Sequence, residues 1–423
     1  MKVLIVGGGG REHALAWKVA NSPKVTQVFC APGNGGTYLE EKCVNVNISA
    51  SDIEGQLAFA KENSIDLTIV GPEQPLVDGI VDRFNQEGLR IFGPSKLGAA
   101  LEGSKIFAKD FMKKYGVKTA EYMNFHNAEE ALTYLKKSSY PLVIKADGLA
   151  AGKGVIICNS YEEAAKGITE YMLEDIFKGA GKQIVIEEFL EGVEASILSI
   201  TDGETIIPFI SSKDHKKIFE SEEGPNTGGM GAIADNPYYT MEVEEQFRRD
   251  IMLPTLNGIK NENLDFIGII FFGVMITLKG VYLLEYNVRF GDPETQTVLP
   301  LLESDLVDII ESAINKKLSN TEIKWIKKKS CCVNLVSGGY PDKYGTGYEI
   351  LNMDTENTTS TEKIFVSGAK YDDGVLKTSG GRVLSLVAWK DSSEEARSRA
   401  YELAGKVDFK DKYYRKDIGK INR

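Results

Sequence analysis

The sequence has few of the residues that build disulfide frameworks and zinc sites. Its 423 residues include five cysteines, an odd number without a C-x-x-C pair, and only three histidines. A disulfide framework or a zinc site is therefore not expected. A reducing compartment such as the cytoplasm fits this cysteine usage better.

A basic surplus and a long apolar run are also missing. The formal net charge of −11 argues against DNA or RNA as a main partner. The longest apolar stretch, IGIIFFGVMITL, is about half of a membrane span. The apolar run in MKVLIVGGGG is too short for a signal peptide. We expect a soluble, cytoplasmic protein without a nucleic-acid or membrane partner.

Glycine, in contrast, is abundant and clustered, with 42 residues in the chain. The length predicts about two to four domains. Over residues 1–100 strands alternate with helices, which predicts a doubly wound parallel sheet. Over 101–325 several strands follow one another without helices, which predicts α+β architecture. Residues 326–423 predict a small β-rich domain.

Two local elements are predicted inside the central region. The apolar spacing in SKIFAKDFMKKYG predicts a helix that ends at Gly116, because glycine is the usual residue after a helix C-terminus. The segment IIFFGVMITLKGVYLLEYNVRF predicts a long β-hairpin with its turn at Lys279–Gly280.

The segment VGGGGREH lies between a predicted strand and a predicted helix. Its glycines would let backbone N–H groups approach a phosphate at the helix N-terminus. Arg11, Glu12 and His13 stand where the dinucleotide fingerprint G-x-G-x-x-G needs its third glycine, so a nicotinamide site is disfavoured. A site for a phosphorylated substrate and a purely structural turn both stay open.

A second glycine-rich segment, IKADGLAAGKGV, follows a strand that ends near Lys145. Its spacing is not that of a Walker A loop, and a strand rather than a helix follows it. The pattern favours a flap of backbone amides and lysines over phosphates. A hairpin with surface lysines is the alternative.

Two more segments carry weaker signals. In IVIEEFLEGVEAS an apolar strand ends in acidic residues that could read an adenine edge and ribose hydroxyls, or form an exposed acidic hairpin. In SSKDHKKIFESEEGPNTGGMGA a charged cluster precedes a long glycine-rich loop, which favours a functional loop over a merely solvated one.

The segment LLEYNVRFGDPE places charge on an apolar strand. Because strand side chains alternate, Glu285, Asn287 and Arg289 share one face, and the residues between them take the other. A carboxylate and an amide oxygen suit Mg²⁺, whose remaining ligands are often phosphate and water. A guanidinium beside them would neutralise charge on a transferred phosphoryl group. A network of salt bridges at the strand end is the alternative.

Together these motifs resemble the ATP-grasp superfamily and, within it, the phosphoribosylamine–glycine ligase family. The resemblance runs in order from residue 1 to about 419 and rests on strings such as GGREHALAWK, IKADGLAAGKGV, GPNTGGMGA, RFGDPETQ and GGRVL. It implies a step of de novo purine biosynthesis. Glycine, ATP and 5-phosphoribosylamine would give glycinamide ribonucleotide, ADP and phosphate through a glycyl phosphate intermediate.

The resemblance also implies roles for individual residues. The metal ligands, for Mg²⁺ or Mn²⁺, would be Glu285 and Asn287. ATP would be bound by Lys105, Lys145, Gly148, Gly152, Lys153, Gly154, Glu187, Glu188, Phe189, Leu190 and Glu194. The catalytic residues near glycine and the phosphoryl group would be Arg289, Asp292 and Asp214. The substrate residues would be Gly9, Gly10, Arg11, Glu12, Gly71, Pro72, Glu73, Asn226, Thr227 and Gly228.

The resemblance further implies a mobile subdomain over about residues 117–190 that covers ATP, and a monomer. Other functions remain as alternatives: another ATP-grasp carboxylate–amine ligase, a nicotinamide-dependent oxidoreductase, or a silent nucleotide-binding module.

Overall fold

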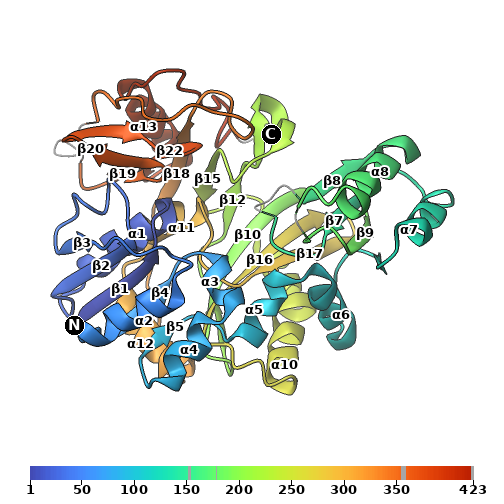
Figure 1. Cartoon of the computed structure of the whole chain (residues 1–423), viewed down its shortest axis with the longest axis horizontal. Coiled ribbons are helices and arrows are strands. Elements are labelled where there is room, and N and C mark those ends of the chain that lie inside the picture. The colour runs from blue at the N-terminus through green and yellow to red at the C-terminus, as the bar shows by residue number, and fades with distance from the viewer. Residues whose placement is uncertain (151–153, 178, 354–358, 421–423) are drawn as a thin grey trace.

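The computed structural model describes residues 1–150, 154–177, 179–353 and 359–420. Figure 1 shows the N-terminal sheet on the left, a central sheet, a subdomain that projects to the right, and the C-terminal elements at the upper left. The predicted combination of α/β and α+β architecture is confirmed. No helix within the described ranges is long and apolar enough to cross a membrane.

The N-terminal sheet is parallel, with strand order β3-β2-β1-β4-β5, as the alternation of strands and helices predicted. Its strands are β1 (Lys2–Gly7), β2 (Gln27–Pro32), β3 (Cys43–Asn45), β4 (Leu67–Val70) and β5 (Ile91–Phe92). The helices of this region are α1 (Gly10–Ala20), α2 (Ile53–Glu62), α3 (Glu73–Asp78) and α4 (Ile80–Gln86). The apolar residues of β1 are fully buried, because helices cover both faces of a doubly wound sheet.

Two helices connect this sheet to the rest of the chain, α5 (Lys96–Gly103) and α6 (Lys105–Tyr115). The Ser104 side chain accepts a hydrogen bond from the Phe107 N–H and so caps α6. Gly116 follows the helix in the left-handed conformation with φ 69°, which confirms the predicted end.

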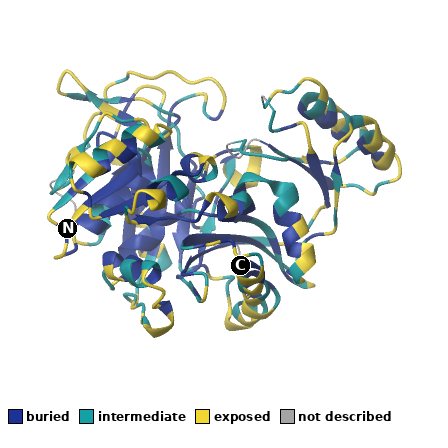
Figure 2. Cartoon of the chain, turned by 60° about the horizontal axis from the view of Figure 1, so that its bottom comes forward, coloured by how far each residue is buried: buried dark blue, intermediate teal, exposed yellow. Residues whose placement is uncertain are grey.

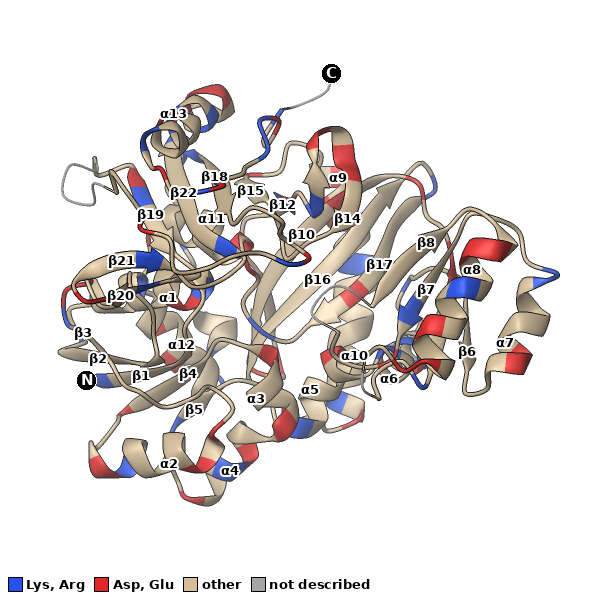
Figure 3. Ribbon diagram, turned by 45° about the horizontal axis from the view of Figure 1, so that its top comes forward, with Lys and Arg blue, Asp and Glu red and all other residues tan. Residues whose placement is uncertain are grey.

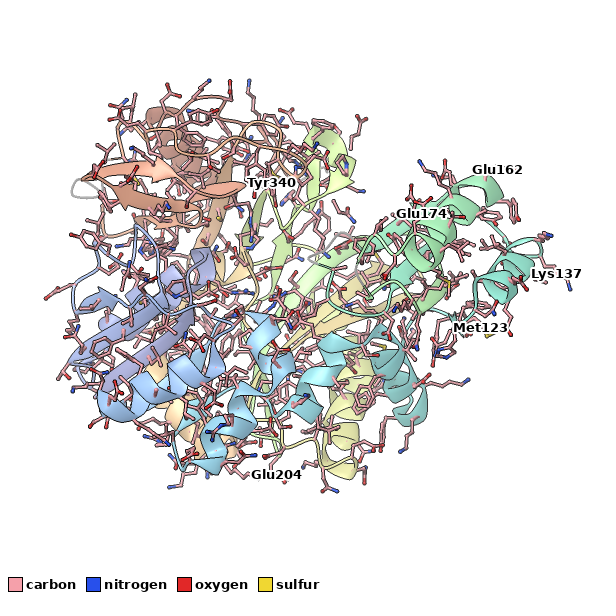
Figure 4. The ribbon with its side chains drawn as sticks, viewed as in Figure 1. Met123, Lys137, Glu162, Glu174, Glu204 and Tyr340 are labelled. Carbon is pink, nitrogen blue, oxygen red and sulfur yellow. The ribbon has the colours of Figure 1, made fainter. Side chains whose placement is uncertain are left out.

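The projecting subdomain is a four-stranded antiparallel sheet of order β6-β9-β7-β8 with helices on one side. It contains β6 (Tyr122–Phe125), α7 (Ala128–Leu135), β7 (Leu142–Ala146), β8 (Val155–Cys158), α8 (Tyr161–Ile168), a π-helix (Thr169–Leu173) and β9 (Ile184–Glu188). It has an apolar core of its own. Met123, Lys137, Glu162 and Glu174 mark its outer parts in Figure 4.

The largest sheet has nine strands in the order β17-β16-β10-β12-β15-β18-β22-β19, with β11 beside β10. Its strands are β10 (Val193–Thr201), β11 (Ile206–Pro208), β12 (Ser212–Asp214), β15 (Gly231–Ala234), β16 (Gly268–Thr277), β17 (Gly280–Asn287), β18 (Lys329–Val336), β19 (Glu362–Val366) and β22 (Arg382–Lys390). Figure 2 shows that its strands are largely buried. Strands between residues 193 and 390 thus share one continuous sheet.

Smaller elements surround this sheet. Two hairpins are β13 (Lys217–Phe219) with β14 (Glu223–Asn226), and β20 (Ala369–Asp372) with β21 (Val375–Thr378). The helices are α9 (Met241–Phe247), a π-helix (Arg248–Met252), α10 (Leu253–Asn261), α11 (Glu294–Val298), α12 (Leu306–Ile314) and α13 (Ser393–Lys406). Short 3₁₀ turns occupy Glu220–Glu222, Leu299–Leu301 and Leu318–Asn320.

One detail differs from the sequence expectations, and one pairing extends them. The central hairpin forms, but Thr277 pairs with Gly280, so its turn residues are Leu278 and Lys279, one position earlier than predicted. The region after residue 325 is β-rich, as expected, and its strand β18 pairs with β15 from Gly231↔Val333 to Ala234↔Ser330. Backbone pairing therefore runs across the boundary expected near residue 325.

Candidate active site

The strand β17 and the residues after it have the predicted alternation. Tyr286, Val288 and Phe290 are at most 1% exposed and belong to the core. Glu285, Asn287 and Arg289 are on the opposite face and are partly exposed. The polar face can therefore meet a ligand while the apolar face fixes the strand.

Glu285 lies between two lysines. Its Oε2 is 3.9 Å from Lys105 Nζ and its Oε1 is 3.9 Å from Lys216 Nζ. Burial alone would raise the pKa of Glu285, but these lysines, with Lys145 and Arg289, lower it to about 2. The carboxylate is ionised at neutral pH and is not held by a short hydrogen bond.

The donor set around Glu285 fits a divalent cation that is also bound by phosphate. Glu285 and Asn287 offer a carboxylate and an amide oxygen, the hard ligands that Mg²⁺ prefers. Within the described ranges no group of three or more His, Cys, Asp or Glu residues could hold a metal. The protein would thus supply few ligands, and phosphate and water the others.

Arg289 is fixed by residues from the N-terminal region. Its Nη2 is 3.1 Å from Glu102 Oε1 and donates to Asn287 Oδ1 at 3.2 Å, and its Nε is 3.2 Å from Glu73 Oε2. Glu102, on α5, also accepts the Val288 N–H at 2.7 Å. Sequence reasoning missed Glu102. The signal was a carboxylate on the buried face of a short helix.

Lys145 on β7 and Glu187 on β9 form the centre of a buried cluster. Lys145 Nζ is 3.0 Å from Glu187 Oε2 and donates to the Leu284 carbonyl at 3.0 Å. Lys109 Nζ approaches the same Oε2 at 3.2 Å, and burial lowers the pKa of Lys109 to about 8. The Glu187 carboxylate therefore faces two buried lysines.

Lys109 is a second residue that sequence reasoning missed. It follows Lys105 by four positions on α6, so both side chains are on the same helix face. Only 2% of Lys109 is exposed, whereas Lys105 reaches Glu285. The spacing was a usable signal, but it did not reveal which lysine is buried.

The other residues expected at ATP are near this cluster or follow β9. Gly148 has φ 133°, a conformation that favours glycine, and Gly154 is buried. Gly152 and Lys153 lie outside the described residues. Glu188 accepts the Glu121 N–H at 3.0 Å. Phe189 and Leu190 are at least partly exposed. Glu194 Oε2 is 3.0 Å from Lys216 Nζ.

The expected substrate residues of the N-terminal sheet gather at the carboxyl ends of β1 and β4. These neighbouring parallel strands end at the same edge, where α/β sheets bind ligands. Gly9, Gly10, Arg11 and Glu12 follow β1, and Gly71, Pro72 and Glu73 follow β4. A Cβ at Gly71 would lie 2.1 Å from Glu12 Oε1, so any larger residue there would displace the Glu12 side chain.

Arg11 joins this edge to the strand of Arg289. Its Nε is 2.6 Å from Glu12 Oε1, its Nη2 is 3.3 Å from Glu73 Oε2, and its Nη1 donates to the Phe290 carbonyl at 3.2 Å. Burial would raise the pKa of Glu73, but Arg11 and Arg289 lower it to about 2. Glu73 is therefore an ionised bridge between the two guanidinium groups.

Glu12 also bears on the nicotinamide alternative. Its Oε2 accepts the Gly9 N–H at 2.5 Å, at the N-terminus of α1. A dinucleotide pyrophosphate normally occupies this position of a doubly wound fold. The protein's own carboxylate occupies it here.

The C-terminal elements reach the site through Arg382 of β22 and Tyr340. Arg382 Nη1 is 3.2 Å from Asp292 Oδ1 and also donates to the Gly228 carbonyl. The Gly228 N–H donates to the Tyr340 hydroxyl at 2.9 Å. Figure 4 labels Tyr340 at the edge of the C-terminal elements, beside the central sheet. Sequence reasoning quoted the GGRVL string without giving Arg382 a role.

Asp214 lies at the end of β12 beside Glu294. Burial and the nearby Glu294 carboxylate raise the pKa of Asp214, and burial raises the pKa of Glu294. The Ser196 hydroxyl donates to Glu294 Oε1 at 3.1 Å, whereas Asp214 Oδ1 is buried without a hydrogen-bond partner. Asn226 ends β14, and the Thr227 hydroxyl donates to the Lys216 carbonyl at 2.7 Å.

Apart from Gly152 and Lys153, which lie outside the described residues, the structure thus brings the predicted residues to one region between the N-terminal sheet, the projecting subdomain and β17. Figure 3 shows basic and acidic residues together where β7 and β17 meet. Lysines converge on Glu285 and Glu187, two arginines converge on Glu73, and Arg382 contacts Asp292. Such an arrangement can bind a polyphosphate at one end and a second anion at the other.

Comparison with solved structures gives the class of protein. The biotin carboxylase domain of the 2-oxoglutarate carboxylase of Hydrogenobacter thermophilus, solved with MgADP, matches with a TM-score of 0.75 over 97% of this chain and 91% of that one. At 16% identity this likeness shows the fold alone. The ATP-grasp (A) domain model of phosphoribosylglycinamide synthetase matches residues 103–295. The fold is that of an ATP-grasp protein.

The N domain and C domain models of the same family match residues 1–102 and 330–421. The phosphoribosylamine–glycine ligase of Clostridium acetobutylicum is 60% identical over 99% of this chain and 100% of its own length, and that of Fusobacterium nucleatum is 55% identical over 100% and 99%. The crystal structure of the Thermotoga maritima ligase matches with a TM-score of 0.84 and 35% identity, over 99% of this chain and 100% of that one. The chain belongs to the phosphoribosylglycinamide synthetase family.

Proposed function

We propose that this protein joins glycine to 5-phosphoribosylamine at the expense of ATP, as the names of its relatives state for them. The products are glycinamide ribonucleotide, ADP and phosphate, in purine biosynthesis. The observation that carries the proposal is that Glu285, approached by Lys105, shares a strand face with Arg289, and that Arg289 and Arg11 both contact Glu73. It connects a site suited to metal and phosphate with the ligand edge of the N-terminal sheet.

At the nucleotide end, Lys105, Lys145 and Lys216 surround Glu285 and neutralise phosphate charge. The segment that contains Gly148 and Gly154 supplies backbone N–H groups for phosphate. Glu285 and Asn287 hold a divalent metal, Mg²⁺ or Mn²⁺, which supplies charge neutralisation on the phosphates when bound. The ribose and adenine are bound near Glu194 and the chain after β9.

At the reacting end, the glycine carboxylate attacks the γ-phosphate. A bond forms between the carboxylate oxygen and phosphorus, and the bond to ADP breaks, which gives glycyl phosphate. The amine of phosphoribosylamine then attacks the carbonyl carbon, loses a proton and expels phosphate. Arg289 stabilises the transferred group, because a fixed guanidinium needs no reorganisation as charge develops.

The contacts of the remaining residues favour the two small substrates. Asp292 and Asp214, with Asn226, Thr227 and Gly228, lie on the side of Arg382 and are proposed around glycine. The residues after β1 and β4 are proposed around phosphoribosylamine. No step needs a protein nucleophile, so catalysis consists of positioning and charge stabilisation.

An omission assay tests this function. The protein is incubated with MgATP, glycine and phosphoribosylamine formed in situ from ribose 5-phosphate and ammonia. In the complete mixture we expect ADP and phosphate to form in equal amounts. When phosphoribosylamine is left out, we expect ADP to form only if hydroxylamine is added to trap glycyl phosphate. ADP formation that is indifferent to glycine would contradict the proposal.

The same assay distinguishes the alternatives. Another carboxylate–amine ligase would respond to a different acid, and a silent nucleotide-binding module would bind MgADP without turnover. A nicotinamide enzyme would bind NADPH, which the position of Glu12 at the α1 N-terminus disfavours.

We also propose that the protein is a monomer, which light scattering would test.

A further inference from the structure

The hairpin of β13 and β14 connects two parts of the candidate site. Lys216 directly precedes it, and Thr227 and Gly228 directly follow it. Its strands pair only with each other, as a two-stranded sheet apart from the central one. Its conformation must therefore be fixed by contacts other than sheet hydrogen bonds.

Those contacts come from the segment Tyr413–Ile418, which we call the C-terminal strap. The Tyr413 hydroxyl donates to the Ile218 carbonyl at 3.0 Å. Asp417 Oδ2 accepts the Ser221 N–H at 2.8 Å. The strap thus holds the hairpin at a strand and at its turn.

Arg415 is the centre of the strap. Its Nη1 donates to the Lys217 carbonyl at 2.9 Å, and its Nη2 is 2.8 Å from Glu222 Oε1. Asp417 orients the guanidinium from the other side, with Oδ1 2.9 Å from Nε and Oδ2 2.9 Å from Nη2. Only 1% of Arg415 is exposed. A guanidinium buried this deeply has a fixed direction, because any shift would leave donors unpaired.

The fixed carbonyl is one residue from Lys216. The Lys216 Nζ lies 3.0 Å from Glu194 Oε2 and 3.9 Å from Glu285 Oε1. At the other end of the hairpin, Thr227 donates two hydrogen bonds to the Lys216 carbonyl, from its N–H at 2.8 Å and from its hydroxyl at 2.7 Å. The backbone of Lys216 therefore follows the position of the hairpin.

We propose that Arg415 is a positioning residue for nucleotide binding, acting through the hairpin backbone on Lys216. This inference rests on the proposed function in that Lys216 serves the phosphates and Glu285. The C-terminal strap acts on the site through the hairpin. Its effect is to keep an ammonium group within reach of the metal-binding carboxylate.

The test compares Arg415→Gln with Arg399→Gln on the full chain. Arg399 is in the same C-terminal region and pairs with Glu362 and Glu402, but it does not contact the hairpin. We expect Arg415→Gln to raise the KM for MgATP and the calorimetric Kd for MgADP about tenfold, the effect of losing one charge-assisted contact. The KM for glycine and the values for Arg399→Gln should change less than about twofold.

A second variant guards against a loss of folding. Glu222→Gln removes one partner of Arg415 on the hairpin, and its side chain is 52% exposed, so the fold should be kept. We expect a smaller weakening of MgADP binding in the same direction. Unchanged binding in both Arg415→Gln and Glu222→Gln, or equal weakening in Arg399→Gln, would overturn the proposal.

A double-mutant cycle separates action through Lys216 from general loosening. In the Lys216→Met background, Arg415→Gln should add little to the loss of MgADP binding, since the group that it positions is absent. Full additivity would overturn the proposal. The omission assay on the unmodified protein decides the proposed function separately, because MgADP binding can be measured whether or not glycine is ligated.

Discussion

Lys145 and Glu187 form a buried ion pair across the neighbouring antiparallel strands β7 and β9, with Nζ and Oε2 3.0 Å apart. The pair is diagonal, since Val143 is directly opposite Glu187 and Val185 is opposite Lys145. The carboxylate fixes the lysine, and the lysine is the group proposed to meet ATP phosphate. We therefore propose that Glu187 supports nucleotide binding by fixing Lys145.

The first prediction concerns this pair. Glu187→Gln leaves Lys145 and Lys109 buried without an anion, which should lower stability by about 3 kcal/mol. The melting temperature should fall and MgADP should bind more weakly. Glu170→Gln is the control, because its pair with Lys166 is exposed and contributes about 0.5 kcal/mol or less. Similar melting temperatures for the two variants would contradict the prediction.

The second prediction concerns the metal. Glu285→Gln removes the ionised carboxylate between Lys105 and Lys216, so turnover should fall by a factor of about 100 or more even at saturating Mg²⁺. Initial rates over a Mg²⁺ titration measure the effect. Glu204→Gln is a control at the far end of the molecule, as Figure 4 shows, and should leave the rates unchanged. Normal turnover of Glu285→Gln would refute the metal assignment.

The third prediction concerns Glu102, which holds Arg289 and the Val288 N–H. Glu102→Gln keeps a hydrogen-bond acceptor but removes the charge, so Arg289 loses its alignment. We expect kcat to fall about tenfold to a hundredfold, with the KM for ATP changed little. Steady-state kinetics with each substrate varied in turn measure this. A rise in the KM for ATP with unchanged kcat would show that Glu102 serves the nucleotide instead.

The fourth prediction concerns pH and stability. The pKa of Glu285 is lowered from its ordinary value of 4.5 to about 2 in the folded protein. The folded state therefore binds fewer protons than the unfolded state between these values. The contribution of the ionised Glu285 carboxylate to the free energy of unfolding is complete above pH 4.5 and is lost as the pH falls towards 2. The melting temperature of the unmodified protein should consequently fall more steeply below about pH 4.5 than that of Glu285→Gln. Parallel curves of melting temperature against pH for the two proteins would contradict this prediction.

Much of the fold could be read from local pattern. The parallel sheet of residues 1–100 followed from strands that alternate with helices, and the end of α6 followed from Gly116. The hairpin turn was misplaced by one residue, because Lys279–Gly280 looks like a turn while Gly280 already pairs with Thr277. The chain pattern also predicted the β-rich character of the C-terminal region, but not that β18 pairs with β15 and so extends the central sheet.

The candidate site was likewise predictable where it depends on local pattern. Period-two alternation placed Glu285, Asn287 and Arg289 on one face, and the structure has them there. Glu102, Lys109 and Arg382 were missed because each resembles an ordinary helix or strand residue. Their roles depend on partners that are far away in the sequence. Val288 and Glu102, for example, are joined by a hydrogen bond although 186 positions separate them.

The sequence by itself determined the strands and helices, the glycine positions, the polar face of β17 and the resemblance to a family. These are properties of neighbouring residues, since side-chain period and backbone freedom act over a few positions. Only the tertiary structure decided which charges meet. It turned the Glu187 carboxylate towards Lys145, filled the α1 N-terminus with Glu12, and brought Arg415 against the hairpin after Lys216. Burial decides those pairings, because a charge removed from water is stable only beside a partner that the whole fold delivers.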